Sequence, residues 1–154
     1  RITISTAGII RKINQYTSEG HPYKLAVSLN ASNELQRLKT MPITKSNSFK
    51  ELINSSKNYT LQTKKKITFE YVMLSNINDS SSDARALIRQ LGSINCKLNL
   101  IPYNEIDGDF KRPSNEKIDN FLKILAHAPF PVTIRWSKGQ EIDAGCGQLA
   151  TMRD

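Results

Sequence analysis

Several residue types that would mark a particular class of protein are scarce in this chain. Its 154 residues include two cysteines, Cys96 and Cys146, too few for the disulfide framework of a small secreted protein and in keeping with a reducing cytoplasm. No apolar run approaches the roughly 20 residues that a membrane-spanning helix needs. Aromatic residues amount to 7% and do not alternate with basic ones, so base stacking on single strands has little support. We therefore expect a cytoplasmic protein with no membrane partner.

What the chain has in excess is positive charge. Its net charge is +8 and its pI is near 9.6, which favours a polyanionic partner such as RNA or DNA. A basic protein without such a partner remains the alternative on charge alone. The length suits a single domain over residues 1–154. Because the chain begins with arginine inside a strand-like run, we expect it to be the C-terminal portion of a longer protein.

Strand-like runs alternate with helical patterns along the whole chain. Predicted strands cover residues 1–5, 24–30, 66–74, 96–103 and 131–136. Helical spacing of apolar residues predicts helices around 9–16, 49–59, 84–91 and 118–125, with Ser46 or Ser48, a serine of 80–82, and Ser114 as N-caps. Repeated strand–helix units build a parallel sheet, because each helix carries the chain back across one face. The predicted fold class is therefore α/β with a parallel sheet.

Small polar residues follow the predicted strands. In parallel sheets ligands bind at the carboxyl ends of the strands, so these residues are expected to gather along one binding edge. Turns favour serine and asparagine in any case, and that explanation remains open at this point. The residues are Ser5-Thr6, Ser28-Leu29-Asn30, Ser75-Asn76, Tyr103-Asn104 and Ser137-Lys138.

Cys146 lies between Gly145 and Gly147, just beyond the last predicted strand. Flanking glycines give the backbone freedom and leave the sulfur accessible, as a reactive thiol requires. The alternative is a flexible tail that happens to carry a cysteine. Cys96 lies within a strand-like run, and we predict that it is buried packing.

Six blocks of the chain occur in this order: residues 1–8, 25–31, 41–43, 67–74, 96–104 and 139–150. Together they make the chain resemble the RlmN/Cfr family of radical-SAM methyltransferases, which methylate adenosine in RNA. Arg11 stands where the family usually has proline, and Trp136 where a basic residue is usual. The resemblance implies a (β/α) partial barrel of the radical-SAM type, about the second half of a six-stranded barrel plus a C-terminal extension.

The resemblance also implies a function: methylation of adenosine C2 in ribosomal RNA and transfer RNA, with S-adenosyl-L-methionine as cofactor. Alternatives are a Cfr-like C8 methyltransferase and a non-enzymatic RNA-binding remnant. By match to the family blocks, Cys146 becomes the S-methylcysteine intermediate. The implied S-adenosylmethionine contacts are Ser5, Ser28, Leu29, Asn30 and Asn104.

The family binds a 4Fe–4S cluster through a CxxxCxxC loop, reduced by a partner such as flavodoxin. With two cysteines in all, this chain lacks that loop, so we predict no metal ligand in it and no catalysis by this polypeptide alone. Glu70 is either a polar wall of the barrel lumen or part of a buried pair, and the sequence assigns it no role. The lysine run 64–66 precedes a strand and is predicted to be a solvated loop. Candidates for phosphate contacts are Lys111, Arg112, Arg135 and Lys138.

Overall fold

Five parallel strands in the described part of the chain form a single sheet, in which the spatial order equals the order along the chain. The structure, a computed structural model, describes residues 2–105 and 108–136. The predicted parallel sheet is confirmed, and predicted and observed strand bounds differ by no more than two residues. The strands are β1 (Thr3–Thr6), β2 (Lys24–Ser28), β3 (Ile67–Met73), β4 (Cys96–Pro102) and β5 (Val132–Ile134).

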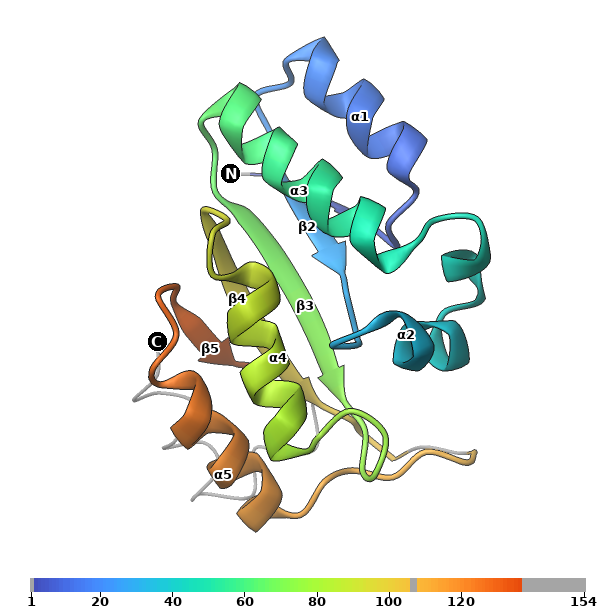
Figure 1. The fold of residues 1–154 in the computed structure, drawn as a ribbon, viewed down its shortest axis with the longest axis vertical. Helices are drawn as coiled ribbons and strands as arrows, with labels where there is room; N and C mark the ends of the chain where they lie inside the picture. Colours follow the sequence, from blue (N-terminus) through green and yellow to red (C-terminus); the bar gives the residue numbers. More distant parts are fainter. Residues whose placement is uncertain (1, 106–107, 137–154) are drawn as a thin grey trace.

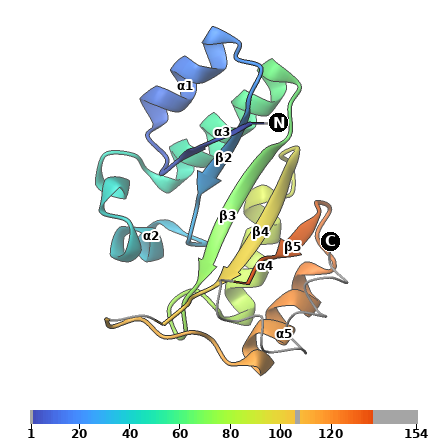
Figure 2. The ribbon, with the colours of Figure 1, turned by 180° about the vertical axis from the view of Figure 1, so that it is seen from behind.

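The longer helices all lie on the same face of this sheet, as Figure 1 and the opposite view in Figure 2 show. None of the helices in the described part of the chain is both long and apolar enough to cross a membrane. Sequential parallel strands with helices on one face are the arrangement of an incomplete (β/α) barrel, in agreement with the predicted partial barrel. The helices are α1 (Ile10–Glu19), α3 (Phe49–Thr63), α4 (Ser81–Leu91) and α5 (Asn115–Leu125).

Alternate residues of the central strands show why one face is covered. In β3, Phe69 and Tyr71 have no exposed surface, whereas Thr68, Glu70 and Val72 are partly exposed. β4 follows the same two-residue period. Side chains of successive strand residues point to opposite faces, so the apolar set packs beneath the helices and the other set lies on a face that no described helix covers. We refer to this second surface as the open face.

Of the helices α1, α3, α4 and α5, the last three begin at a serine N-cap, as predicted. Ser48 rather than Ser46 accepts a hydrogen bond from Glu51 N (3.2 Å), and Ser114 accepts one from Lys117 N (3.2 Å). Ser80 forms a capping box with Asp83 at the start of α4. Each cap satisfies a backbone N–H that the helix cannot, which contributes about 1 kcal/mol.

One helical segment, α2 (Glu34–Thr40) with the 3-10 turn η1 (Pro42–Lys45), was not predicted. It has no apolar stripe, since Leu35 is 74% exposed and the buried residue of α2 is Arg37. Its start is fixed by Asn33, whose side chain accepts a hydrogen bond from Gln36 N (2.9 Å). A helix anchored by a buried charge leaves no hydrophobic period in the sequence.

The one-sided core gives a stability prediction. Phe69→Ala, at a position with no exposed surface, should lower the free energy of unfolding by about 3–5 kcal/mol, because it removes the ring and leaves a cavity. Leu61→Ala is the matched control, since Leu61 is 57% exposed and the change should stay within about 0.5 kcal/mol. Urea unfolding followed by circular dichroism measures both. Equal losses in the two variants would contradict the assigned core.

Candidate functional site

The carboxyl ends of the strands lie along one edge of the sheet, because all the strands run in the same direction. At this edge Ser5 is in register with Ala26, so it shares the open face with Ser28, two residues further along β2. Ser5 is exposed and Ser28 partly exposed. Neither hydroxyl makes a hydrogen bond to another described residue, which leaves both as possible donors and acceptors for a ligand.

Asn30 lies at the same edge, where the chain turns out of the sheet with φ 56°. Its Oδ1 accepts a hydrogen bond from Val72 N (2.8 Å), so the side chain prolongs the β2–β3 ladder beyond the last strand residue. Its carbonyl oxygen accepts a hydrogen bond from Asn78 Nδ2 (3.0 Å), and its own Nδ2 lies 3.5 Å from Met41 Sδ. Asparagine tolerates the left-handed conformation, and here its amide group stabilises the corner of the edge.

Leu29, also predicted at the site, is a core residue with no exposed surface. Its N–H donates to Glu70 O (2.8 Å), and its carbonyl oxygen accepts from Arg37 Nε (3.0 Å). Both backbone groups are therefore engaged within the protein. The place of Leu29 in a binding site rests on the family resemblance alone.

Asn104 follows β4 and lines a pocket of about 340 Å³ together with Glu105, Arg112 and Pro113. The guanidinium of Arg112 lies 5.2 Å from the centre of the Trp136 ring. The backbone N–H of Arg112 donates to Glu105 Oε2 (2.8 Å). A cation above an aromatic face is attracted by the ring quadrupole. This contact joins the segment after β4 to the end of β5 and places positive charge beside Asn104.

A row of polar side chains crosses the open face. Thr133 Oγ1 donates to Asn99 Oδ1 (3.0 Å), and Glu70 Oε2 lies 3.6 Å from Arg135 Nη2. Glu70 is thus part of this polar row and also forms an ion pair with Arg135. The Arg135 side chain is 63% exposed, so water screens the attraction between the two charges. Asn99 and Thr133 were missed as site residues, although polar residues at every second strand position signalled them. The residues in register are Ser28, Glu70, Asn99 and Thr133.

The thiol of Cys96 is packed away from this face, as predicted. It is 1% exposed, and burial raises its pKa to about 12 despite the nearby charge of Lys66, which acts in the opposite direction. A cluster ligand must be a thiolate, so this cysteine does not suit a 4Fe–4S cluster. Among the described residues, no three His, Cys, Asp or Glu side chains gather as a metal site. Cys146 lies outside the described residues, as does Lys138.

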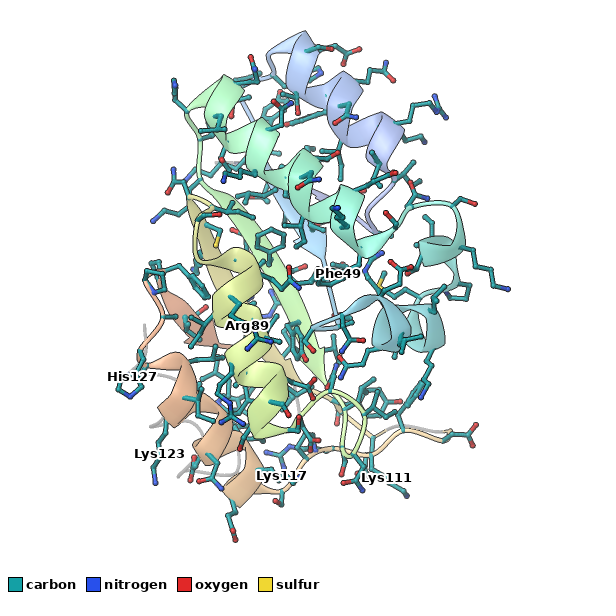
Figure 3. The ribbon with its side chains drawn as sticks, viewed as in Figure 1. Phe49, Arg89, Lys111, Lys117, Lys123 and His127 are labelled. Atoms are coloured by element: carbon teal, nitrogen blue, oxygen red, sulfur yellow. The ribbon has the colours of Figure 1, made fainter. Side chains whose placement is uncertain are left out.

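Basic side chains occupy several separate parts of the molecule. Lys64 ends α3 and Ile67 opens β3, so the lysine run 64–66 lies at the amino edge, opposite Ser5 and Ser28, as predicted. Figure 3 shows Arg89 and Lys117 on the outer helix layer. Both line a second pocket of about 620 Å³, which Asn76, one of the predicted strand-end residues, also lines. Lys111 lies in the loop after β4 and accepts a hydrogen bond at its carbonyl oxygen from Ser75 N (2.8 Å).

Comparison with solved structures gives the class of protein. A radical SAM methyltransferase from Sphaerobacter thermophilus superimposes with a TM-score of 0.86 at 40% identity, covering 96% of this chain and 44% of that one. A domain of pyruvate-formate lyase-activating enzyme from Bacteroides vulgatus shares the fold (TM-score 0.67, 12% identity), over 86% of this chain and 80% of that one. The fold is therefore that of a radical-SAM methyltransferase segment.

Sequence relatives narrow the class, although no family model matches the chain. It is 43% identical over 152 residues to the dual-specificity RNA methyltransferase RlmN of Desulfotalea psychrophila, covering 98% of this chain and 42% of that protein. The RlmN of Lawsonia intracellularis is 45% identical, with the same coverage. The chain is thus homologous to part of the RlmN RNA methyltransferases, which confirms the resemblance, and it spans about two fifths of their length.

The buried thiol gives a second prediction. In a Cys146→Ser background, maleimide should label Cys96 at pH 8 at least about 100-fold more slowly in the native protein than in urea. A pKa of about 12 leaves only about one thiolate in ten thousand at that pH, and burial blocks the reagent as well. The matched Cys96→Ser variant retains only Cys146, which we expect to label faster. Equal labelling of Cys96 in buffer and in urea would contradict its assignment to the core.

Proposed function

We propose that this chain is part of a radical-SAM methyltransferase that methylates C2 of adenosine in ribosomal RNA and transfer RNA. The observation that carries the proposal is identity of 43–45% with RlmN RNA methyltransferases over 98% of the chain. The fold supports it, because the strand order and the one-sided helix layer match a radical SAM methyltransferase at a TM-score of 0.86. We assign the activity to the whole protein and not to this chain alone, because the chain covers only 42% of the length of these relatives.

S-adenosylmethionine fits the carboxyl edge of the open face. The proposed contacts there are the hydroxyls of Ser5 and Ser28 and the amides of Asn30 and Asn104, with Leu29 included by resemblance. Neutral donors and acceptors can hold the ammonium, carboxylate and ribose hydroxyls of this cofactor without opposing its sulfonium charge. When bound, the cofactor supplies the methyl group and a radical that removes hydrogen. The chain's own residues orient it at the edge.

The cluster and the methyl carrier complete the proposal. Because the described residues do not suit a 4Fe–4S cluster, its ligands are assigned to the part of the relatives that this chain does not cover. Cys146 is proposed as the residue that carries the methyl group as S-methylcysteine, with a reductant such as flavodoxin serving the whole enzyme. The placement of Cys146 between two glycines supports this role.

RNA as substrate is supported by charge. The chain has a net charge of +8, and basic side chains lie close to the carboxyl edge, at Lys111, Arg112 and Arg135. Lysine and arginine at such an edge can bind the phosphates of a substrate whose base enters the site. A cytoplasmic location follows from an RNA substrate of this kind.

Methylation of RNA by the natural full-length protein tests the proposal. With S-adenosylmethionine, a reductant and ribosomal RNA, nucleoside mass spectrometry should find 2-methyladenosine. Cys146→Ala should abolish the product, and Ser28→Ala should raise the KM for S-adenosylmethionine about tenfold, which is the loss of roughly one good hydrogen bond. The control Ser81→Ala, at an exposed helix position, should leave both parameters unchanged.

Other products would decide between the alternatives. Formation of 8-methyladenosine would identify a Cfr-like enzyme and would contradict C2 specificity. RNA binding without any methylation, by a protein loaded with cluster and cofactor, would favour the RNA-binding remnant and overturn the proposed activity.

A further inference from the structure

Arg37 is the one charged side chain without any exposed surface in the described part of the chain. Burying a guanidinium is costly unless hydrogen bonds satisfy it, and no carboxylate among the described residues lies within ion-pair distance of this one. Desolvation accordingly lowers the pKa of Arg37, with the charge of Glu34 acting in the opposite direction. Burying a leucine at this position would cost less free energy than burying a charge, so the presence of arginine needs a structural reason.

The hydrogen bonds of Arg37 supply that reason. Nη2 donates both to Ala7 O (2.6 Å) and to Ser28 O (2.9 Å), and Nε donates to Leu29 O (3.0 Å). These carbonyl groups lie where β1 and β2 end. The pairing between the two strands stops at Thr6 and Val27, one residue before Ala7 and Ser28. The guanidinium therefore joins the two chain segments at the point where the strand ladder no longer does.

The surroundings hold the guanidinium in place. Nη1 donates to Thr44 Oγ1 (3.3 Å), and the Thr44 hydroxyl donates to Met41 O (2.6 Å). Gly8 has φ +104°, and a Cβ there would lie 2.8 Å from Arg37 Nη2 and 3.2 Å from a Leu52 methyl group. The backbone after β1 thus passes directly against the guanidinium, which only glycine permits.

We propose that Arg37 is a positioning residue for the S-adenosylmethionine site. Its guanidinium fixes the spacing between the segment after β1 and the segment after β2, and through them the spacing of Ser5 and Ser28. The inference rests on the proposed function, and Arg37 itself does not touch the ligand. Lysine cannot replace it, because one ammonium nitrogen lacks the planar set of donors that reaches three carbonyl oxygens and a hydroxyl.

The test compares Arg37→Lys and Arg37→Met with Leu91→Ala in the natural full-length protein. Leu91 is fully buried at the opposite end of the sheet, where its carbonyl faces Cys96 Sγ (3.8 Å), so its truncation destabilises the fold away from the site. KM and kcat are measured at a temperature at which circular dichroism shows every variant folded. We expect the KM for S-adenosylmethionine to rise at least about tenfold in both Arg37 variants and to stay within about twofold in Leu91→Ala.

The result that would overturn the role is an Arg37→Lys or Arg37→Met enzyme whose KM matches that of Leu91→Ala. If neither Arg37 variant folds, Thr44→Val provides the second route. It removes the hydroxyl that accepts from Nη1 and leaves the carbonyl contacts, so we expect a KM increase of about threefold. An unchanged KM in Thr44→Val would then count against the proposal.

Amide hydrogen exchange separates this inference from the proposed function, because it needs no ligand. Exchange at residues 5–8 and 28–30 should be faster in the Arg37 variants than in Leu91→Ala, if the guanidinium holds these segments. Unchanged exchange in a protein that binds S-adenosylmethionine normally would overturn the positioning role alone. If the protein without substitutions, loaded with its cluster, binds no S-adenosylmethionine, the proposed function is overturned. The positioning role of Arg37 for that site is then overturned as well.

Discussion

Burial of a single face of the parallel sheet beneath α1, α3, α4 and α5 is the constraint on which the other features depend. It demands apolar residues at every second strand position and leaves the intervening positions free to be polar. The open face therefore carries hydroxyl, amide and carboxylate groups at Ser28, Glu70, Asn99 and Thr133 without cost to the core. A ligand site can be built there because the hydrophobic energy of the fold comes from the other side.

The edge of the sheet is organised by buried polar side chains rather than by packing. Asn78 has no exposed surface, and its amide nitrogen donates to Val72 O (2.8 Å) and to Asn30 O (3.0 Å). The hydroxyl of Tyr71 donates to Asn78 O (2.6 Å), and burial raises the pKa of this tyrosine well above its usual value. Like the Arg37 guanidinium, these groups donate to carbonyl oxygens beyond the strand ladder. The consequence is an edge whose irregular backbone is held by side-chain hydrogen bonds.

The fold was largely predictable, because its determinants are local and periodic. The two-residue alternation in 67–73 and the helical spacing of Leu87 and Leu91 follow from the sequence directly, as do the serine caps. The segment 34–45 was not predictable in this way. Its anchor, Arg37, bonds to Ala7 thirty residues earlier, and Ser32 bonds to Asp83 fifty-one residues later. Contacts of that kind leave no short-range pattern.

The candidate site was predictable only in part for the same reason. Strand ends pointed to Ser5, Ser28 and Asn104, and the parallel sheet brings the first two to one face. Two features depend on how β2 and β3 end relative to each other. The Asn30 side-chain oxygen accepts a hydrogen bond from Val72 N, and Leu29 is a core residue. The pairing of Asn99 with Thr133 depends on strand register, which a strand sequence alone does not specify.

A crystal structure of the natural full-length protein with S-adenosylmethionine bound tests the central claim most directly. The account predicts density for the cofactor on the open face, at the carboxyl edge, with hydrogen bonds to the hydroxyls of Ser5 and Ser28. Cofactor density on the helix side instead, for example in the pocket lined by Asp79, Arg89 and Lys117, would contradict it.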